Sequence, residues 1–215
     1  KGFAMGRGHS RVSNKPEVLG EYPVAVLAEE ITTPGENQVR ALITVAGNPV
    51  LSTPHSNQLD AALAELEFMV SIDIYLNETT RHADVILPPP SHLERSHYDM
   101  VFTAFSIRNV ANFSEAVFER EDDQPDEWQI LAKLAGIAQG AGADVDPAVI
   151  DEYVFGSLLG NLLKDKSSPI HGRSEDEIRE IVSATNLNGP ERILDTLLRT
   201  GPYGEAFGAN PKGIN

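Results

Sequence analysis

Between residues 41 and 87 the chain alternates short apolar runs with one helical pattern of hydrophobic positions. The three runs are 41–46, 68–75 and 83–87. Continuous apolar runs of this kind are typical of parallel strands, and we expect the first strand to be covered on both faces. A helix over 56–67 is predicted between the first two runs, because its apolar positions recur at helical spacing. Those positions are Leu59, Ala62, Leu63 and Leu66. The pattern predicts an α/β fold with a Rossmann-like parallel sheet and flanking helices.

The segments on either side of this sheet give weaker signals. Residues 1–23 are rich in glycine and basic residues and are predicted to be irregular, whereas the composition of 23–31 favours a helix. A fourth strand is expected near 105–110. Asp126 is predicted to open a helix, with Gln129 completing a capping box. The residues expected to face inward from that helix are Trp128, Leu131, Leu134, Ala135 and Ala138.

Beyond residue 142 the pattern is helical, and we expect a C-terminal helical subdomain with an irregular tail. Capping or first-turn residues mark three helix starts: Asp146 with Pro147, Ser174 with Glu177, and Pro190. The expected organisation is therefore an N-terminal arm and lead-in over 1–40, a Rossmann-like domain over 41–142, and the helical subdomain with its tail over 143–215.

Charge and cysteine content narrow the possible functions. The formal net charge is −15, which argues against nucleic acid as a partner because phosphate contacts need Lys and Arg. The basic stretch 1–15 either reaches an anionic ligand or partner, or is a solvated terminus. With no cysteine, the chain itself has no disulfide, thiolate metal site or cysteine nucleophile. No apolar run is long enough for a membrane span and no secretion signal opens the chain, so we expect a cytoplasmic location.

Two polar residues stand directly after predicted strands, at the sheet edge where ligands bind in open parallel sheets. Asn48 follows the first strand, where its amide could meet a phosphate or ribose while Gly47 lets the backbone approach; the alternative is a turn residue before Pro49. Asp73 ends the second strand, where its carboxylate could accept from ribose hydroxyls or guanine N–H groups. The alternative for Asp73 is a cap of the turn that starts at Asn77.

Other chemistry has weaker support in the sequence. His92 and His97 could join His82 and either Glu94 or Asp84 in a metal site, but their spacing in an expected loop is a weak signal. Hydrolase and nucleoside-triphosphatase motifs are absent from the sequence. A nicotinamide-dependent dehydrogenase would need a glycine fingerprint after a strand, which GRGHS near the N-terminus does not supply.

An ordered set of motifs brings a family resemblance. GNP at 47–49, SIDIYLNET at 71–79, ADVILP at 83–88 and the nearby Glu94 together resemble the third domain of the dimethyl sulfoxide reductase family, over about residues 41–138. Members are molybdenum oxidoreductases that carry a bis(molybdopterin guanine dinucleotide) cofactor. The resemblance implies that cofactor, with molybdenum or tungsten, in a parent enzyme. It also implies an iron–sulfur cluster in the parent that this cysteine-free chain does not ligate.

The resemblance also implies roles for single residues. Asn48 and Asp73 would contact the cofactor, with Ile72 contributing only its backbone. Arg95 stands in for the Lys of a Glu-Lys pair that reaches the nucleotide in many members. Asp126 aligns with a nucleotide-contacting Asp, although a role as helix N-cap explains it equally well. After Arg95 the sequence departs from the family, with SHYD at 96–99 where many members have Gly-Thr.

The interpretation is an internal fragment of a molybdopterin-dependent oxidoreductase that binds one guanine nucleotide arm of the cofactor. We expect the isolated fragment to be inactive, and its partners to be the remaining domains of the parent and an electron-transfer subunit. The alternative is a non-catalytic Rossmann-like protein-interaction module. These two hypotheses differ at Asp73, whose replacement by Ala should reduce the cofactor content of the parent only under the first.

Overall fold

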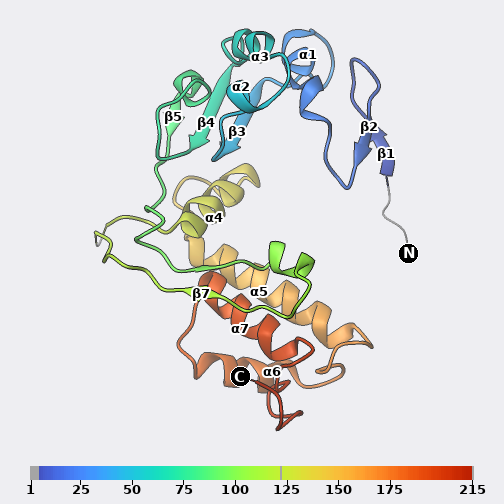
Figure 1. Ribbon diagram of the computed structural model, residues 1–215, viewed down its shortest axis with the longest axis vertical. Helices are drawn as coiled ribbons and strands as arrows, with labels where there is room; N and C mark the ends of the chain where they lie inside the picture. Colours follow the sequence, from blue (N-terminus) through green and yellow to red (C-terminus); the bar gives the residue numbers. More distant parts are fainter. Residues whose placement is uncertain (1–4, 122, 215) are drawn as a thin grey trace. The chain divides into compact units, whose positions relative to one another are not determined.

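The computed structural model describes residues 5–121 and 123–214 of the chain. The chain divides into two compact units, residues 1–124 and 125–215, which we refer to as the first and second unit. The first unit contains the parallel sheet and the second contains four helices among its described residues (Figure 1). The domain boundaries expected from the sequence stay a prediction.

A three-stranded parallel sheet forms the centre of the first unit. Its strands are β3 (Ala41–Val45), β4 (Phe68–Ile72) and β5 (Val85–Ile86), in the order β3-β4-β5. Figure 1 shows them as neighbouring arrows that point the same way. Ala41 pairs with Phe68 and Val45 with Ile72, so β3 and β4 end at the same edge. The α/β, Rossmann-like fold class is confirmed.

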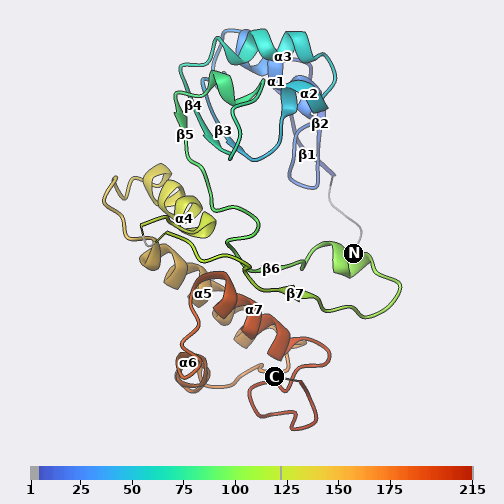
Figure 2. The same cartoon turned by 60° about the vertical axis from the view of Figure 1, so that its left-hand side comes forward.

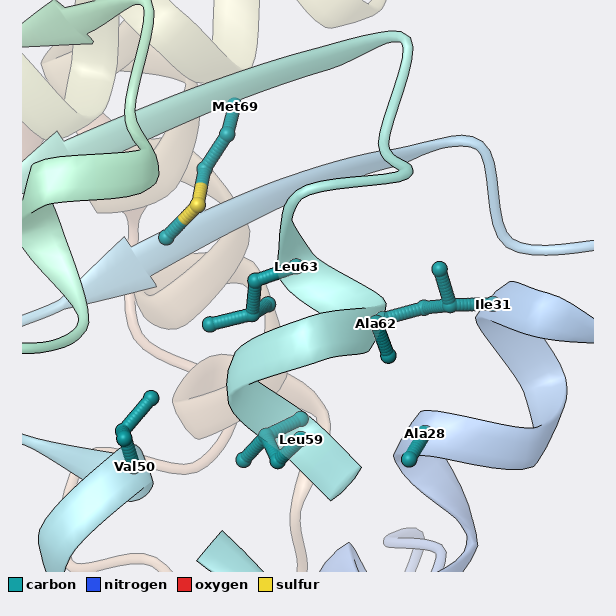
Figure 3. Close-up of a cluster of buried hydrophobic side chains, with 7 residues drawn as sticks. All are labelled: Ala28, Ile31, Val50, Leu59, Ala62, Leu63 and Met69. Carbon is teal, nitrogen blue, oxygen red and sulfur yellow. The ribbon is translucent and has the colours of Figure 1, made fainter. Parts of the chain in front are cut away.

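One face of the sheet is covered by helices. These are α1 (Leu27–Thr32), which follows the 3-10 turn Val24–Val26, and α3 (Ser56–Leu63), with the short α2 (Pro49–Ser52) before it. Figure 2 shows α1 beside α3. Their side chains meet β4 in one buried cluster, drawn in Figure 3. Its members are Ala28, Ile31, Val50, Leu59, Ala62, Leu63 and Met69. The two methyl-sized side chains in this cluster let α1 and α3 approach closely.

Two expectations for this region are wrong in detail. The predicted helix 56–67 ends at Leu63, because the chain tightens into a turn and Glu67 N–H then donates to Arg40 O at 2.8 Å, which starts the sheet pairing. The first strand is not covered on both faces. Side chains alternate across a strand, so Leu42 packs on the helical side while Ile43 and Val45 point to the other face, where each is 51% exposed.

The N-terminal segment, predicted to be irregular, contains an antiparallel pair of strands, β1 (Met5–His9) and β2 (Pro16–Val18). Polar contacts explain why apolar periodicity does not show it. The buried Glu17 accepts from the backbone N–H of Arg7 at 3.1 Å and from its guanidinium at 2.6 Å. Arg11 likewise pairs with Glu30 at 3.2 Å. The two arginines of the basic stretch are therefore engaged inside the first unit.

The long connection from 88 to 121 is largely without regular structure. It contains one short antiparallel pair, β6 (His97–Tyr98) and β7 (Phe113–Ser114), visible in Figure 2, and a 3-10 turn at Phe102–Phe105. The strand expected near 105–110 is wrong, because those residues form no ladder and Ile107 is fully exposed. An alternating apolar pattern gives a strand only where a neighbouring strand is available to pair with it.

The described part of the second unit is helical, as expected. Its helices are α4 (Glu127–Ala138), α5 (Pro147–Lys164), α6 (Glu175–Ser183) and α7 (Gly189–Thr200). The predicted starts are confirmed: Asp126 and Gln129 form the capping box of α4, and Asp146 caps α5. The inward face expected for α4 is wrong at Leu131 and Ala138 only, since the other three expected residues, Trp128, Leu134 and Ala135, are partly buried. Ile130 and Gly136 are its buried residues, and Leu131 and Ala138 are exposed.

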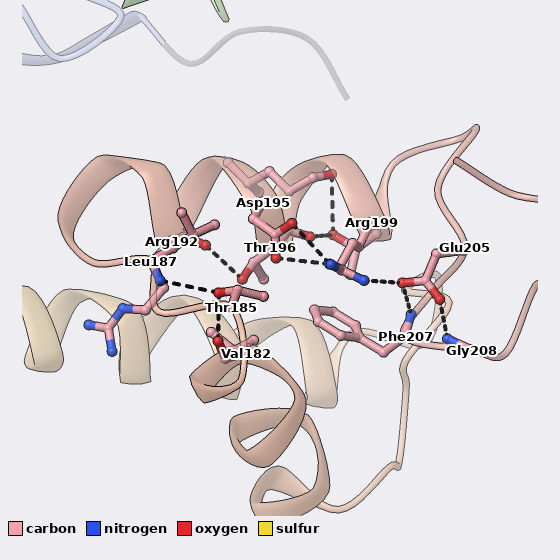
Figure 4. Close-up of polar contacts among 12 residues, drawn as sticks. Val182, Thr185, Leu187, Arg192, Asp195, Thr196, Arg199, Glu205, Phe207 and Gly208 are labelled. Carbon is pink, nitrogen blue, oxygen red and sulfur yellow. Dashed lines mark hydrogen bonds and ion pairs between the residues drawn. The ribbon is translucent and has the colours of Figure 1, made fainter. Parts of the chain in front are cut away.

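The core of the second unit joins α5, α6 and the tail after α7. Its buried members are Phe155, Leu159, Ile170, Ile178, Val182, Ala206 and Phe207. Figure 4 shows how polar contacts fix the tail: Arg199 on α7 binds Asp195 at 2.8 Å and Glu205 at 2.7 Å, and Glu205 accepts from Phe207 N–H. Across residues 5–121 and 123–214, no helix is both long and apolar enough to span a bilayer.

Candidate functional site

The candidate site lies at the common carboxyl edge of β3 and β4. After β3 the backbone turns through two left-handed residues, Ala46 at φ 54° and Gly47 at φ 77°. Ala46 N–H donates to the carbonyl of Ile72 at 2.8 Å, so the turn starts on the end of β4. A methyl group built on Gly47 would have no neighbouring atom within 4 Å. Gly47 therefore leaves open space in which a ligand can reach the backbone.

Asn48 makes hydrogen bonds across the sheet edge. Its Oδ1 accepts from the hydroxyl of Thr79 at 2.7 Å, and its Nδ2 donates to Glu78 Oε2 at 2.6 Å. Although Asn48 stands at the N-cap of α2, its side chain does not cap that helix. Its backbone carbonyl accepts from Leu51 and Ser52 N–H, so Asn48 also serves the turn before Pro49. The two sequence alternatives for Asn48 are thus compatible with each other.

Asp73 stands directly after β4 and is only 8% exposed. Its Oδ1 accepts from the backbone N–H of Tyr75 at 2.8 Å, and its Oδ2 is 3.4 Å from Asn77 Nδ2. Asp73 therefore caps the turn at Tyr75, whereas the backbone N–H groups of the turn that starts at Asn77 are capped by Asn77 itself. Both carboxylate oxygens already have partners within the loop after β4.

The loop from Asp73 to Thr80 stabilises itself through side-chain contacts to the backbone. Asn77 Oδ1 accepts from Thr79 N–H at 2.9 Å and from Thr80 N–H at 3.0 Å. The hydroxyl of Thr80 donates to Tyr75 O at 2.9 Å and accepts from Asn77 N–H at 2.8 Å. Asn77 thus links Asp73 to Thr79, and Thr79 links the loop to Asn48. A continuous hydrogen-bonded network joins the two predicted site residues.

Glu78 is a member of this network to which the sequence interpretation gave no role. Its side chain is exposed, and the Asn48 amide lowers the pKa of its carboxyl, with a smaller contribution from the positive charge of Arg81. The carboxyl is therefore ionised at neutral pH. Glu78 lies inside the motif SIDIYLNET, but its contact with Asn48 joins residues 30 positions apart. Nothing in the local pattern indicates that pairing.

The other three predicted residues lie outside the turns that follow β3 and β4. Ile72 is 1% exposed and its carbonyl accepts from Ala46 N–H, so this backbone group serves the sheet. Arg95 lies in the connection after β5, with its Nη2 3.3 Å from His92 Nδ1. Asp126 caps α4 in the second unit, where its N–H donates to Gln129 Oε1 at 2.7 Å. Among the predicted residues, the hydrogen bonds described above therefore connect Asn48 with the loop that contains Asp73.

An open hollow of about 720 Å³ lies in the first unit, beside the connection that contains Arg95. Glu94 lines it together with residues from the segment 116–124, including Arg120. The hollow is mostly polar, with both signs of charge on its walls. It therefore does not by itself favour an anionic ligand.

The proposed histidine metal site does not form in the part of the chain that the structure describes. Among residues 5–121 and 123–214, no group of three or more His, Cys, Asp or Glu side chains is placed to hold a metal ion. His82 instead binds Asp60, with its Nε2 2.7 Å from Asp60 Oδ1, and Arg81 binds the same carboxylate at 2.6 Å. Asp60 thus ties the turn after β4 to α3.

The family is identified by comparison with known proteins. Residues 5–137 match the family model described as molybdopterin oxidoreductase, which is more than half of the chain. The chain therefore belongs to the molybdopterin oxidoreductase family. The resemblance noted from the sequence motifs is confirmed.

Several relatives carry this similarity. The chain is 33% identical over 107 residues to the assimilatory nitrate reductase catalytic subunit of Bacillus subtilis, covering 50% of this chain and 14% of that protein. It is 33% identical over 139 residues to the F420-dependent formate dehydrogenase 2 subunit alpha of Methanococcus maripaludis, covering 64% of this chain and 20% of the relative. Formate dehydrogenase H of Escherichia coli is 33% identical over 98 residues, covering 46% of this chain and 13% of that enzyme. The matched segments thus span a fifth or less of these relatives.

Proposed function

We propose that this chain is part of the catalytic subunit of a molybdopterin-dependent oxidoreductase, and that its first unit binds one guanine nucleotide arm of a bis(molybdopterin guanine dinucleotide) cofactor. The observation that carries the proposal is the amide of Asn48, held by Thr79 at the carboxyl edge of β3. That edge is where open parallel sheets bind nucleotides. Family membership supplies the cofactor class.

The residues at this edge fit a nucleotide. Gly47 provides open space beside exposed backbone, and Asn48 provides a fixed amide donor. The hydrogen-bonded loop from Asp73 to Thr80 holds these groups in place before any ligand arrives, which reduces the entropy lost on binding. Arg95 and Asp126 are proposed as further nucleotide contacts.

The division of labour follows from the cofactor class. The molybdenum or tungsten centre supplies the redox chemistry when the cofactor is bound, and this chain binds and orients one nucleotide arm. The chain has no cysteine, so an iron–sulfur cluster in the parent would take its ligands from elsewhere. We expect no turnover from the isolated chain.

The remaining domains of the parent and an electron-transfer subunit are the proposed partners, in the cytoplasm. The exposed apolar side chains of the segment 100–118 support a role for this segment in contacting other parts of the enzyme. Nine of its large apolar side chains are exposed: Met100, Val101, Phe102, Phe105, Ile107, Val110, Phe113, Val117 and Phe118. Exposed apolar surface of this extent usually marks an interaction site.

The proposal is tested on the full-length parent, produced in a host that makes the cofactor. Metal is measured by mass spectrometry and guanine nucleotide after acid release. About two guanine nucleotides per molybdenum or tungsten are expected in the wild type, and less of both in Asn48→Ala. Wild-type protein without metal or nucleotide would instead favour the non-catalytic interaction module.

A further inference from the structure

The positions of the protons in the network fix the orientation of the Asn48 amide. Val50 N–H donates to the hydroxyl oxygen of Thr79 at 3.0 Å, and Thr79 is fully buried. A hydroxyl has one proton to donate, and the remaining partner of this hydroxyl is Asn48 Oδ1 at 2.7 Å. The carbonyl of the Asn48 amide therefore faces Thr79, and its NH2 group faces away.

Glu78 gives the same orientation independently. An ionised carboxylate only accepts hydrogen bonds, so the atom of Asn48 that lies 2.6 Å from Glu78 Oε2 is the nitrogen. Asn48 and Glu78 thus present a neighbouring amide donor and carboxylate acceptor at the exposed edge of the sheet. The amide keeps one N–H beyond its contact with Glu78, and the carboxylate keeps lone pairs that can accept from a ligand.

This donor and acceptor pair selects among the parts of a nucleotide. A phosphate oxygen bound to Asn48 would lie close to the negative charge of Glu78 and be repelled. An uncharged group that both donates and accepts suits the pair, because its donors meet the carboxylate and its acceptor meets the amide. The ribose hydroxyls and the N–H edge of guanine both have this character.

Asp73 is less suited to that acceptor role. It is nearly buried, and its two oxygens accept from Tyr75 and Asn77. Glu78 is exposed, and the Asn48 amide holds its carboxylate beside the turn that follows β3.

We infer that Glu78 contacts the nucleoside portion of the guanine nucleotide, accepting hydrogen bonds from the ribose hydroxyls or the guanine N–H groups beside Asn48. The inference rests on the proposed function and deepens it. Under this arrangement the phosphates lie away from the Asn48–Glu78 pair, and Asp73 acts as a positioning residue through Asn77.

The experiment uses the 215-residue chain and isothermal titration calorimetry with guanosine and with GMP. Glu78→Gln keeps the size of the side chain and removes its charge, and it should weaken guanosine binding roughly tenfold through loss of charge-assisted hydrogen bonds. The affinity for GMP should fall to a similar extent. Glu65→Gln, at an exposed glutamate after α3, is the matched control and should leave both affinities unchanged.

Two ligand analogues separate the possible contacts. If the ribose meets Glu78, 2′,3′-dideoxyguanosine binds the wild type weakly and Glu78→Gln costs it little more. If guanine meets Glu78, inosine shows that behaviour instead, because it lacks the exocyclic amine.

The outcomes also distinguish this inference from the proposed function. Wild type that binds neither guanosine nor GMP overturns both. Binding that weakens in Asn48→Ala but is unchanged or strengthened in Glu78→Gln keeps the proposed function and overturns the role of Glu78. A gain for GMP alone in Glu78→Gln would place a phosphate beside Glu78.

Discussion

Thr79 donates to Asn48 Oδ1 at 2.7 Å from a fully buried position, and so connects the loop after β4 to the turn after β3. These two turns form the common edge of the parallel pair β3 and β4. Because the hydroxyl also accepts from Val50 N–H, a single side chain holds both the start of α2 and the orientation of the proposed donor.

Thr79→Val should both destabilise the chain and weaken nucleotide binding. Loss of the hydroxyl leaves the buried N–H of Val50 without its partner, which costs about 1–3 kcal/mol in the free energy of unfolding. The Asn48 amide also loses the contact that orients it. Urea unfolding and guanosine titration measure the two effects.

Thr79→Ser is the matched control for this prediction, because it keeps the hydroxyl and removes one methyl group. It should restore most of the affinity for guanosine. Equal affinities for the Val and Ser variants would show that the hydroxyl does not position Asn48.

Asp73 offers a test of direct against indirect action. Asp73→Asn can still accept from Tyr75 N–H but not from the Asn77 side-chain amide, so we expect only a small loss of loop stability and of guanosine affinity. Asp73→Ala removes the acceptor and should lower both the stability of the loop and the guanosine affinity. If Asp73 bound guanine through its charge, Asn and Ala would reduce the affinity equally.

Leu63 tests the core beneath the sheet. It is fully buried between α3 and β4, and Leu63→Ala should lower the free energy of unfolding by about 2–5 kcal/mol. Leu51→Ala, at an exposed leucine on α2, should change it by less than about 0.5 kcal/mol. Similar losses in both variants would contradict the assignment of the core.

Glu17 predicts a pH dependence for the N-terminal strand pair. Its hydrogen bond with Arg7 lowers the carboxyl pKa from 4.5 to about 2. A depressed pKa favours the folded state above the unfolded value, so this stabilisation is complete above pH 4.5 and is lost as the pH falls toward 2.

The measurement is the NMR titration of the Glu17 side-chain carboxyl. Arg7→Gln should move its midpoint upward toward the ordinary value. An unchanged midpoint would mean that Arg7 is not the cause of the shift. Arg11→Gln, which removes the partner of Glu30 instead, is the control and should leave the Glu17 titration unaffected.

The sequence predicted those elements that local chemistry determines. The runs 41–46 and 68–75 became β3 and β4, and the caps at Asp126 and Asp146 start helices as expected. In each case the signal lies within a few residues of the structure it specifies, either as an apolar run or as a side chain that caps its own helix.

What the sequence missed depends on contacts between distant residues. The β1–β2 pair is stabilised by Arg7 and Glu17, whose polar character resembles that of a loop. The failed strand at 105–110 has an apolar pattern but no pairing partner.

The candidate site shows the same limit. The position of Asn48 at a strand end was predictable, since it follows from the end of an apolar run. Its partner Glu78 was not, because only the register of β3 with β4 brings the two turns together.

The most direct test of the central claim is titration of the 215-residue chain with GMP, followed by amide NMR with Asn48→Ala as the comparison. The account predicts saturable shifts at Gly47, the Asn48 side-chain amide and residues 77–79, and their loss or weakening in the variant. Shifts that are absent from this edge, or that persist unchanged in Asn48→Ala, would contradict the assignment of the nucleotide site.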